Sequence, residues 1–342
     1  MQEALPIAVD TAGSDKGVDA LVEGALKAYV DLGVKSILVG KREDVEASLD
    51  SLGGHKSDFI IAHAPDVIEM TDSPARAVRR KPDSSLCVAF RLVKDGQASA
   101  VISAGHSGAM MAAGLLLAGQ IRGIERAAIG TLIPAVSDYH PAVLLDSGAN
   151  VDCTSNQLVQ FAIMGASYSS ALFGIERPRV ALLSNGSESS KGTDTIRLAA
   201  TTLRSSSLNY VGYVEGRDAS QGMADVIVCD GFTGNVLLKG MEGVVQVVSK
   251  LLRQEAEKSL IDKIRLAIAR PVMKRILQGK LDYSEYGGAP LLGLRELGMV
   301  LHGSSNSRAV YNALRVTRDF VEMGLIEKIT TALAESLSGN PE

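Results

Sequence analysis

The chain has 342 residues, of which 46% are apolar and 22% are charged, and its formal net charge is −4. This length fits about two domains or one large α/β unit, because a typical domain has roughly 150 residues. The acidic balance, the absence of Trp and the presence of only 6 Phe argue against a nucleic-acid binder with aromatic stacking platforms.

The three cysteines, Cys87, Cys153 and Cys229, lie far apart and form no CxxC pair. This spacing excludes a disulfide framework or a zinc ribbon and predicts reduced thiols, as in a cytoplasmic protein. The N-terminal residues include Glu3 and only a short apolar run, so we expect no signal peptide. The uncharged stretch 98–121 is long enough for a membrane span, but its glycines and serines predict a strand, a turn and a buried helix instead.

Short apolar runs alternate with helical patterns along the whole chain. We expect strands at 5–10, 36–40, 58–63, 98–105, 142–150, 179–187, 225–232 and 299–307, and helices over 18–32, 42–52, from about 107 and over 235–252. Continuous apolar strands between helices are typical of a mostly parallel sheet that is covered on both faces. The sequence therefore predicts a single large α/β unit over 1–342 with a mostly parallel central sheet.

Several of these strands end in loops of small and polar residues, at 103–109, 146–152, 184–192, 229–235 and 302–306. In open α/β sheets, ligands bind beyond the carboxyl ends of the strands. Small residues there let backbone N–H groups approach an anion at the start of the next helix. No Walker loop is present and no GxGxxG follows a strand, which argues against a P-loop NTPase and a dinucleotide-dependent dehydrogenase.

Residues 250–280 contain nine Lys or Arg and three Asp or Glu, a net charge of +6. Apolar residues repeat there every four positions, at Leu252, Ala256, Leu260, Ile264 and Ile268. This pattern predicts a basic amphipathic helical hairpin with a break at Pro271. Such a hairpin either packs on its own domain or a twin subunit, or docks an acidic partner or an anionic bilayer.

Two polar residues in the strand-end loops are candidates for catalysis. Lys191 follows a run of serines and offers a compact positive charge for phosphate, although a solvated loop lysine is the alternative. Asn235 stands near the start of the helix expected at 235–252. There it either caps the helix or points its amide at a developing oxyanion.

The string GHSGA at 105–109 lacks the G-x-S-x-G spacing of a serine-hydrolase elbow. We therefore expect a phosphate-binding turn made of Gly105, His106, Ser107 and Gly108 rather than a nucleophilic serine, with a tight turn needed only for packing as the alternative. The five histidines show no metal-ligand spacing, so we expect no metal ion. His106 and His302 lie in strand-end loops and are candidates for a hydrogen bond to substrate.

Several longer strings resemble one family and keep its order along nearly the whole chain. They are KPDSSLCVAFRLVKDGQASAVISAG (81–105), LLDSGANVDCTSNQLVQFAIMG (144–165), ERPRVALLSNGSE (176–188), VEGRD (214–218), ADVIVCDGFTGNVLLKGMEG (224–243), LDYSEYGGAPLLG (281–293) and HGSSN (302–306). The chain resembles the phosphate acyltransferases of bacterial phospholipid synthesis. The family's SAGNTGA is SAGHSGA here, so His106 and Ser107 replace Asn and Thr.

The resemblance implies a fold like that of phosphotransacetylases and isocitrate-type dehydrogenases, usually as a homodimer. It implies conversion of acyl-[acyl carrier protein] and inorganic phosphate to acyl phosphate and free carrier protein, without a cofactor. The product would feed a membrane glycerol-3-phosphate acyltransferase. A cytoplasmic protein with peripheral membrane association is expected, and the basic hairpin would meet either the acidic carrier protein or the anionic membrane.

For this reaction we expect Lys191 to neutralise phosphate or the departing thiolate, and Asn235 to orient the carbonyl. Backbone and side-chain groups of 105–108 would bind phosphate. Further residues expected to line the same crevice are Asn150, Asp230, His302 and Asn306. Two alternatives are a short-chain phosphotransacetylase that uses coenzyme A, and a non-catalytic regulator that binds carrier protein or lipid.

Overall fold

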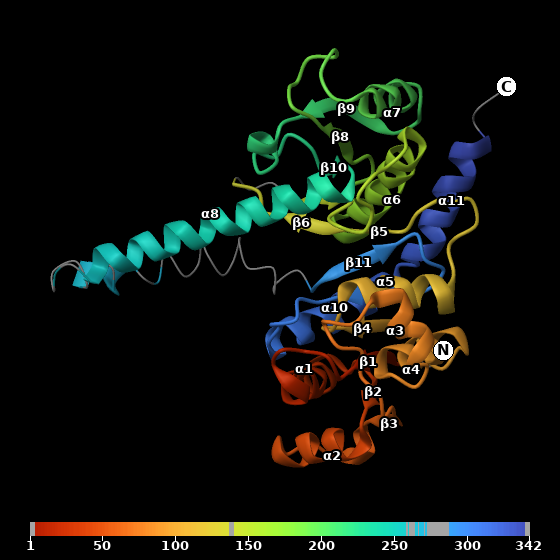
Figure 1. The fold of residues 1–342 in the computed structure, drawn as a ribbon, viewed down its shortest axis with the longest axis vertical. Coiled ribbons are helices and arrows are strands. Elements are labelled where there is room, and N and C mark those ends of the chain that lie inside the picture. Colours follow the sequence, from red (N-terminus) through yellow and green to blue (C-terminus); the bar gives the residue numbers. More distant parts are fainter. Residues whose placement is uncertain are drawn as a thin grey trace.

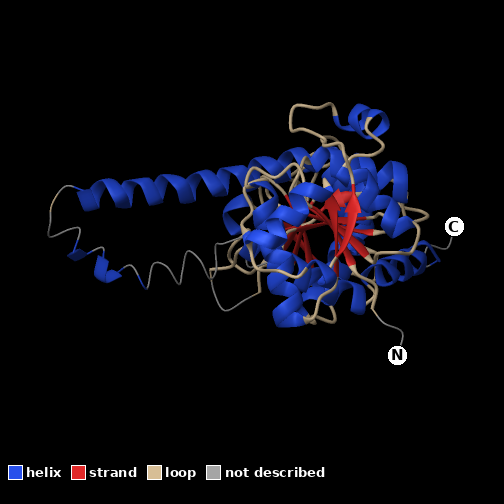
Figure 2. Ribbon diagram, turned by 90° about the horizontal axis from the view of Figure 1, so that it is seen from below, coloured by secondary structure: helices blue, strands red, loops and turns tan. Residues whose placement is uncertain are grey.

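The computed structural model describes residues 4–136, 140–257 and 287–338, together with 259, 264–265, 267–269 and 271. Its strands form two sheets, each at the centre of its own lobe, and one long helix extends away from both (Figure 1). Figure 2 shows the strands inside the body with helices around them.

The first sheet has the order β3-β2-β1-β4-β12-β11-β5. Five neighbouring strands run parallel, and the last two pair antiparallel. The strands are β1 (Ile7–Asp10), β2 (Ser36–Gly40), β3 (Ile60–His63), β4 (Ala100–Ser103), β5 (Ala128–Ile129), β11 (Ala289–Leu292) and β12 (Leu297–Val300). The chain supplies the first four consecutively and returns near its end for β11 and β12.

The second sheet has the order β6-β7-β10-β8-β9, with only β6 antiparallel. Its strands are β6 (Thr131–Ile133), β7 (Ala142–Leu145), β8 (Arg179–Leu183), β9 (Asn209–Val214) and β10 (Val226–Val228). Gly130 alone separates β5 of the first sheet from β6 of the second. The two sheets are therefore joined by a single residue at this crossing.

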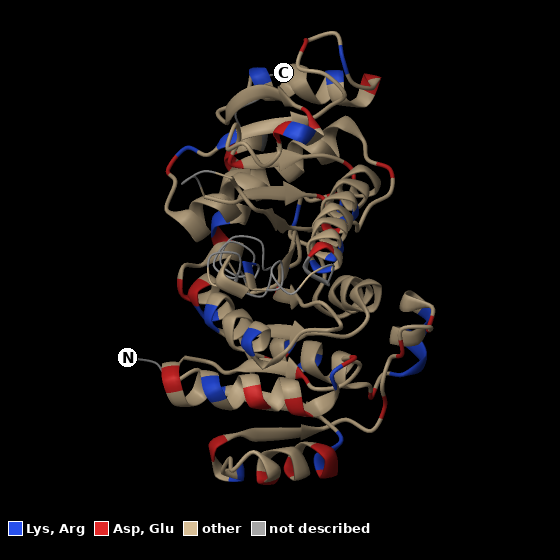
Figure 3. Cartoon of the chain, turned by 90° about the vertical axis from the view of Figure 1, so that its left-hand side faces the viewer, with Lys and Arg blue, Asp and Glu red and all other residues tan. Residues whose placement is uncertain are grey.

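Helices cover both faces of each sheet, because most strands are apolar on both sides. They are α1 (Gly17–Leu32), α2 (Arg42–Ser51), α3 (Pro74–Arg80), α4 (Ser85–Lys94), α5 (Ser107–Ala113), α6 (Ser155–Phe173), α7 (Asp194–Arg204), α8 (Gly231–Glu257), α10 (Ser307–Glu322) and α11 (Leu325–Ser338), with short turns η1 (Lys56–Asp58), η2 (Gly114–Ala118) and η3 (Gly216–Asp218). Charged residues lie mainly on these helices and the loops, while the strands are largely free of them (Figure 3).

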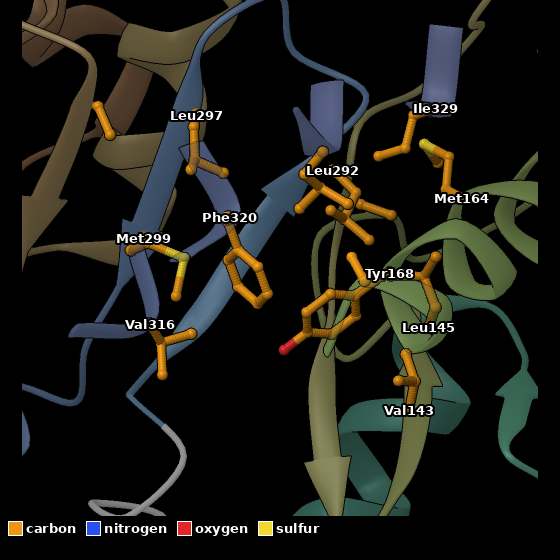
Figure 4. Packing of buried hydrophobic residues seen from close by; sticks show 14 of the residues in the cluster. Val143, Leu145, Met164, Tyr168, Leu292, Leu297, Met299, Val316, Phe320 and Ile329 are labelled. Carbon is orange, nitrogen blue, oxygen red and sulfur yellow. The ribbon is translucent and has the colours of Figure 1, made fainter. Parts of the chain in front are cut away.

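The lobes share one hydrophobic core where α6 meets β11, α10 and α11. Tyr168 of α6 packs edge-on against Phe320 of α10, with ring centroids 5.4 Å apart. Figure 4 shows Leu292 of β11 and Ile329 of α11 on the same side of the core as Met164 of α6. Burial of a large aromatic or aliphatic side chain stabilises by roughly 1.5–3 kcal/mol, so this shared core holds the lobes together.

The first half of α8 packs on the second sheet through Leu237 and Met241. Beyond it the helix leaves the body (Figure 2) and exposes Val244, Val248 and Leu251. Lys250 and Arg253 are exposed on its last turns. The hairpin predicted over 250–280 begins here, but most of it lies outside the described residues.

The α/β class and the mostly parallel sheets are confirmed, and a strand occurs at every place where one was predicted. The strands are divided between two sheets rather than gathered in one. Apolar runs of the same composition belong to both sheets, so their composition does not reveal which strands pair.

Candidate functional site

In the first lobe, three strand-end loops meet at the carboxyl ends of β1, β4 and β12. The backbone N–H of Asp15 and the hydroxyl of Ser14 donate to the carbonyl of Gly303, at 2.9 and 3.1 Å. A Cβ on Gly13 would lie 3.3 Å from the Cα of Gly105, so the first and second loops are also in contact. The predicted residues of 105–108 and of 302–306 are thus gathered on one edge of the first sheet.

His106 caps α5, because its Nδ1 accepts a hydrogen bond from the backbone N–H of Gly108 at 3.2 Å. The N–H of Gly105 donates to the Ser103 hydroxyl at 3.1 Å. Two of the backbone donors predicted for phosphate therefore have partners within the protein. Ser107 is exposed at the first position of α5, next to those donors.

The Ser103 hydroxyl in turn donates to Asp10, with 2.7 Å between Oγ and Oδ2. Asp10 ends β1 and is buried, and its other oxygen accepts from the N–H of Ala12. Burial raises the pKa of Asp10, and hydrogen bonds from Ser85, Ser103 and Ala12 partly offset the rise. Asp10 therefore holds the loops after β1 and β4 together beneath the predicted phosphate turn.

His302 and Asn306 both have local partners. The Nδ1 of His302 lies 2.8 Å from the hydroxyl of Ser304, and the side-chain oxygen of Asn306 accepts from the N–H of Ala309 at 3.0 Å to cap α10. Asn306 thus has the structural function of an N-cap. Its predicted contact with substrate, like that of His302, stays a prediction.

In the second lobe, the turn over residues 146–150 is organised by Asp146, and we call it the Asp146 turn. The N–H groups of Gly148, Ala149 and Asn150 all donate to its carboxylate, at 2.7–3.1 Å. The expectation that these backbone donors are open to a phosphate is therefore wrong, because the protein's own carboxylate takes them. Asn150 also donates its side-chain amide to Asp146 and to the carbonyl of Ala127.

Helix α8 begins at Gly231, four residues before the predicted start. The Asp230 carboxylate accepts from the N–H and the hydroxyl of Thr233, each at 2.8 Å, and so satisfies the first turn. The reading of Asn235 as the N-cap is thus wrong. Asn235 lies inside the helix, is exposed, and has no hydrogen-bond partner for its amide among the described residues.

Lys191 lies in the loop after β8, and its backbone N–H donates to the carbonyl of Glu188 at 3.0 Å. Its side chain passes over Gly186, where an added Cβ would lie 2.7 Å from the lysine Cγ. Lys191 is exposed, and its ammonium has no ion-pair or hydrogen-bond partner in the described part of the chain. Because β8 and β10 are parallel neighbours, Lys191 and Asn235 follow strands that end at the same edge of the sheet.

The structure therefore brings the predicted residues together in two groups, one on each sheet. The groups are linked where the Asp146 turn meets β5, since the N–H of Ser147 donates to the carbonyl of Ile129 at 3.0 Å. Cavities of about 280 and 130 Å³ lie elsewhere, against α6, and none of the predicted site residues lines them. That all ten residues face a single pocket stays a prediction.

Asp10 and Asp146 organise these loops, and neither residue was among the predicted ones. The available signal was a single acidic residue directly after a buried apolar strand, which is costly to bury unless it is hydrogen-bonded. Cys153, three residues beyond the Asp146 turn, is half-buried. Burial and the nearby charges of Asp146 and Asp230 raise the pKa of its thiol to about 11.

The fold of this chain is shared with several solved structures. Over 93% of this chain and 94% of the other, the structure is similar to the EutD phosphotransacetylase from Staphylococcus aureus, with a TM-score of 0.61 at 18% identity. A phosphotransacetylase from Streptococcus pyogenes gives the same score over 98% and 95% of the two chains. A 4-hydroxythreonine-4-phosphate dehydrogenase from Klebsiella pneumoniae gives 0.54 at 13% identity over 93% and 100%. The predicted phosphotransacetylase- and dehydrogenase-like fold is confirmed.

The particular family follows from the sequence as a whole. Residues 5–328 match the model of the fatty acid synthesis protein family, and the chain belongs to that family. The phosphate acyltransferase of Syntrophotalea carbinolica is 45% identical over 100% of this chain and 97% of its own length. That of Pelotomaculum thermopropionicum is 46% identical over 96% and 95%. The chain is thus an acyltransferase, as its resemblance predicted.

Two further observations concern the described residues alone. None of the helices within them is both long enough and apolar enough to span a bilayer. No cluster of three or more His, Cys, Asp or Glu side chains that would suit a metal ion occurs in that part of the chain.

Proposed function

We propose that the chain transfers a long-chain acyl group from acyl carrier protein to inorganic phosphate, giving acyl phosphate and free carrier protein. The observation that carries this proposal is a pair of polar side chains, Lys191 and Asn235, which follow adjacent parallel strands and have no partner for the ammonium or the amide among the described residues. Full-length similarity to phosphate acyltransferases supports the reaction type. An exposed ammonium and an exposed amide at the same sheet edge supply the positive charge and the hydrogen-bond donor that the reaction needs.

In the proposed reaction, a phosphate oxygen attacks the thioester carbonyl carbon and forms the new C–O bond. The tetrahedral intermediate then collapses, the C–S bond breaks, and the electron pair leaves with the thiolate. Lys191 balances the charge of phosphate or of this thiolate. The Asn235 amide donates to the carbonyl oxygen as it becomes an oxyanion, a contact worth about 10²–10³-fold in rate.

The direct attack of phosphate requires neither a cofactor nor an acyl-enzyme. Ser107 does not have the surroundings of a nucleophile, since it is the first residue of α5 beside the His106 cap and has no base as a hydrogen-bond partner in the described part of the chain. The thiol of Cys153 is held protonated by its pKa of about 11, which disfavours it as a nucleophile at neutral pH. Holding phosphate and thioester together supplies much of the remaining rate.

The partners that we propose are acyl carrier protein, a second copy of the chain and the surface of an anionic membrane. The exposed Lys250 and Arg253 on the last turns of α8 support attraction to an acidic protein or to anionic lipid. We further propose a cytoplasmic location, with the acyl phosphate passed to a membrane glycerol-3-phosphate acyltransferase.

The function is tested by supplying phosphate with palmitoyl-carrier protein, palmitoyl-CoA or acetyl-CoA and trapping acyl phosphate with hydroxylamine. Product from the long-chain carrier substrate alone supports the proposal. Product from acetyl-CoA alone would establish a short-chain phosphotransacetylase instead. No product from any donor would favour a regulator that binds carrier protein or lipid.

The role of the basic segment has its own test. Charge reversal at Lys263, Arg265, Lys274 and Arg275 is expected to weaken binding to carrier protein or sedimentation with anionic vesicles. Unchanged binding in both assays would leave packing on the protein itself as the function of 250–280.

A further inference from the structure

The Asp146 carboxylate accepts hydrogen bonds from the backbone of its own turn and from the first lobe. Its residue is fully buried at the end of β7. Oδ1 accepts from the N–H groups of Ile129, Gly148 and Ala149, at 3.1, 3.1 and 3.0 Å. Oδ2 accepts from the N–H of Ala149 at 3.1 Å, and from the N–H and the side-chain amide of Asn150 at 2.7 and 2.9 Å.

Successive backbone N–H groups that point into one turn form a site of the kind that binds phosphate or another anion. Here the anion is part of the chain, because the carboxylate of Asp146 fills the turn that follows it. A buried charge is tolerated only when it is paired or well hydrogen-bonded, so the turn and the carboxylate depend on each other.

The turn is also fastened to the other lobe. Ile129, which donates to Asp146, is the last residue of β5 in the first sheet. The hydroxyl of Ser147 donates to the carbonyl of Ile129 at 3.0 Å, and the amide of Asn150 donates to the carbonyl of Ala127 at 2.8 Å. The Asp146 turn therefore links the edge of the first sheet to the end of a central strand of the second.

Helix α8 packs directly against the Asp146 turn. The N–H of Gly231 donates to the carbonyl of Asn150 at 2.7 Å. A Cβ on Gly234 would lie 2.0 Å from the carbonyl oxygen of Asp146. Gly148, at φ +145°, faces Asn235 closely enough that a Cβ there would lie 3.7 Å from the asparagine Cβ and Cγ. A movement of the turn would therefore displace Asn235.

We propose that Asp146 is a positioning residue, whose carboxylate occupies an internal anion site and thereby fixes Asn235 relative to both sheets. The inference rests on the proposed function in one respect, that Asn235 contacts the reacting thioester. Phosphate must bind elsewhere, because the three backbone N–H groups of this turn already donate to the Asp146 carboxylate.

The test uses Asp146→Asn in the full-length protein, which keeps the shape but turns one acceptor oxygen into a donor. Amide hydrogen exchange is expected to become faster at 148–150 and in the first turn of α8. With palmitoyl-carrier protein and phosphate, kcat is expected to fall about 10²-fold, as for a displacement of about 1 Å at a reacting group. The KM for phosphate should change less than kcat.

Asp225→Asn is the matched control, since Asp225 is also a well-bonded carboxylate of the second lobe. Asp225 directly precedes β10 and accepts from Arg179, the first residue of β8, at the opposite end of the strands from Asn235. This variant is expected to lose stability but to keep its kcat and the exchange protection of 148–150.

A double variant decides whether Asp146 acts through Asn235. If it does, Asp146→Asn with Asn235→Ala is no slower than Asn235→Ala alone, because the contact is already lost. Losses that multiply, or unchanged exchange at 148–150, would overturn the inference. Wild-type protein that forms no acyl phosphate would refute the proposed function instead, and the exchange data would still test the role of Asp146.

Discussion

Replacing Gly234 with alanine is expected to destabilise the protein, although the same change at most helical glycines does the opposite. In an exposed helix interior, alanine is favoured over glycine by about 1 kcal/mol. At Gly234 the added Cβ would lie 2.0 Å from the Asp146 carbonyl oxygen and 3.0 Å from the Cys229 sulfur. Neither the backbone atom nor the buried cysteine can move aside as the end of a flexible side chain would.

Two other glycines of α8 provide matched controls. A Cβ on Gly240 or on Gly243 would meet no atom within 4 Å. Each alanine variant is therefore expected to gain up to about 1 kcal/mol from helix propensity. Overpacking costs about 1–3 kcal/mol, and the gain from helix propensity is common to both variants, so Gly234→Ala should be less stable than Gly240→Ala by about 1–3 kcal/mol.

Urea unfolding followed by far-UV circular dichroism measures this difference, and the absence of Trp makes it preferable to tryptophan fluorescence. The midpoint should fall for Gly234→Ala and rise slightly for Gly240→Ala. The kcat of Gly234→Ala should also fall, since the first turn of α8 must shift and carry Asn235 with it. Equal stability of the two variants would show that α8 does not rest on the Asp146 turn as described.

Three further predictions follow from buried or paired titratable groups. Burial acts to raise the pKa of Asp225, but the hydrogen bonds and charge of Arg179 outweigh burial and lower that pKa. Arg179→Met should therefore lower the free energy of unfolding by about 1–2 kcal/mol at neutral pH. This loss of stability should become smaller as acid protonates Asp225. Because burial raises the pKa of Asp10, the folded state binds the proton of this carboxyl more tightly than the unfolded state does. The stability of the wild type relative to Asp10→Asn should therefore increase as the pH falls from neutral toward the usual pKa range of aspartate. A difference in thermal unfolding temperature that stays constant across that range would contradict this. Because the pKa of its thiol is about 11, Cys153 should react slowly with iodoacetamide at neutral pH in the folded protein. The Cys153→Ser variant should keep the kcat of the wild type. Rapid inactivation of the enzyme by iodoacetamide would count against direct attack by phosphate.

Of the twelve described strands, eight were predicted from apolar runs, and β5, β6, β9 and β11 were not. Of the ten described α-helices, α1, α2, α5 and α8 were predicted. The division into two sheets could not be predicted, since it depends on Gly130, where the chain crosses from β5 to β6. Neither strand is longer than three residues, so the crossing leaves little periodic signal.

The candidate site was predictable in its location and less so in its details. Small-residue loops after parallel strands do lie at the sheet edges, and Lys191 and Asn235 follow neighbouring strands. Glycine-rich sequence alone does not tell whether a backbone donor is open to a ligand or already taken. At Gly148 the partner is Asp146, and at Gly108 it is the ring of His106. Both acceptors are within two residues of the donor, yet only geometry shows the bond.

Lys191 and Asn235 are the two side chains on which the proposed mechanism depends most directly. The rate of hydroxylamine-trapped acyl phosphate formation should be measured for Lys191→Ala and Asn235→Ala, with folding verified by circular dichroism. Neither exposed side chain has a hydrogen-bond partner among the described residues, so both variants should fold. The Asn235 variant should be slower by about 10²–10³-fold. A similarly large loss is predicted for Lys191→Ala, whereas near wild-type rates in both folded variants would contradict the proposed mechanism.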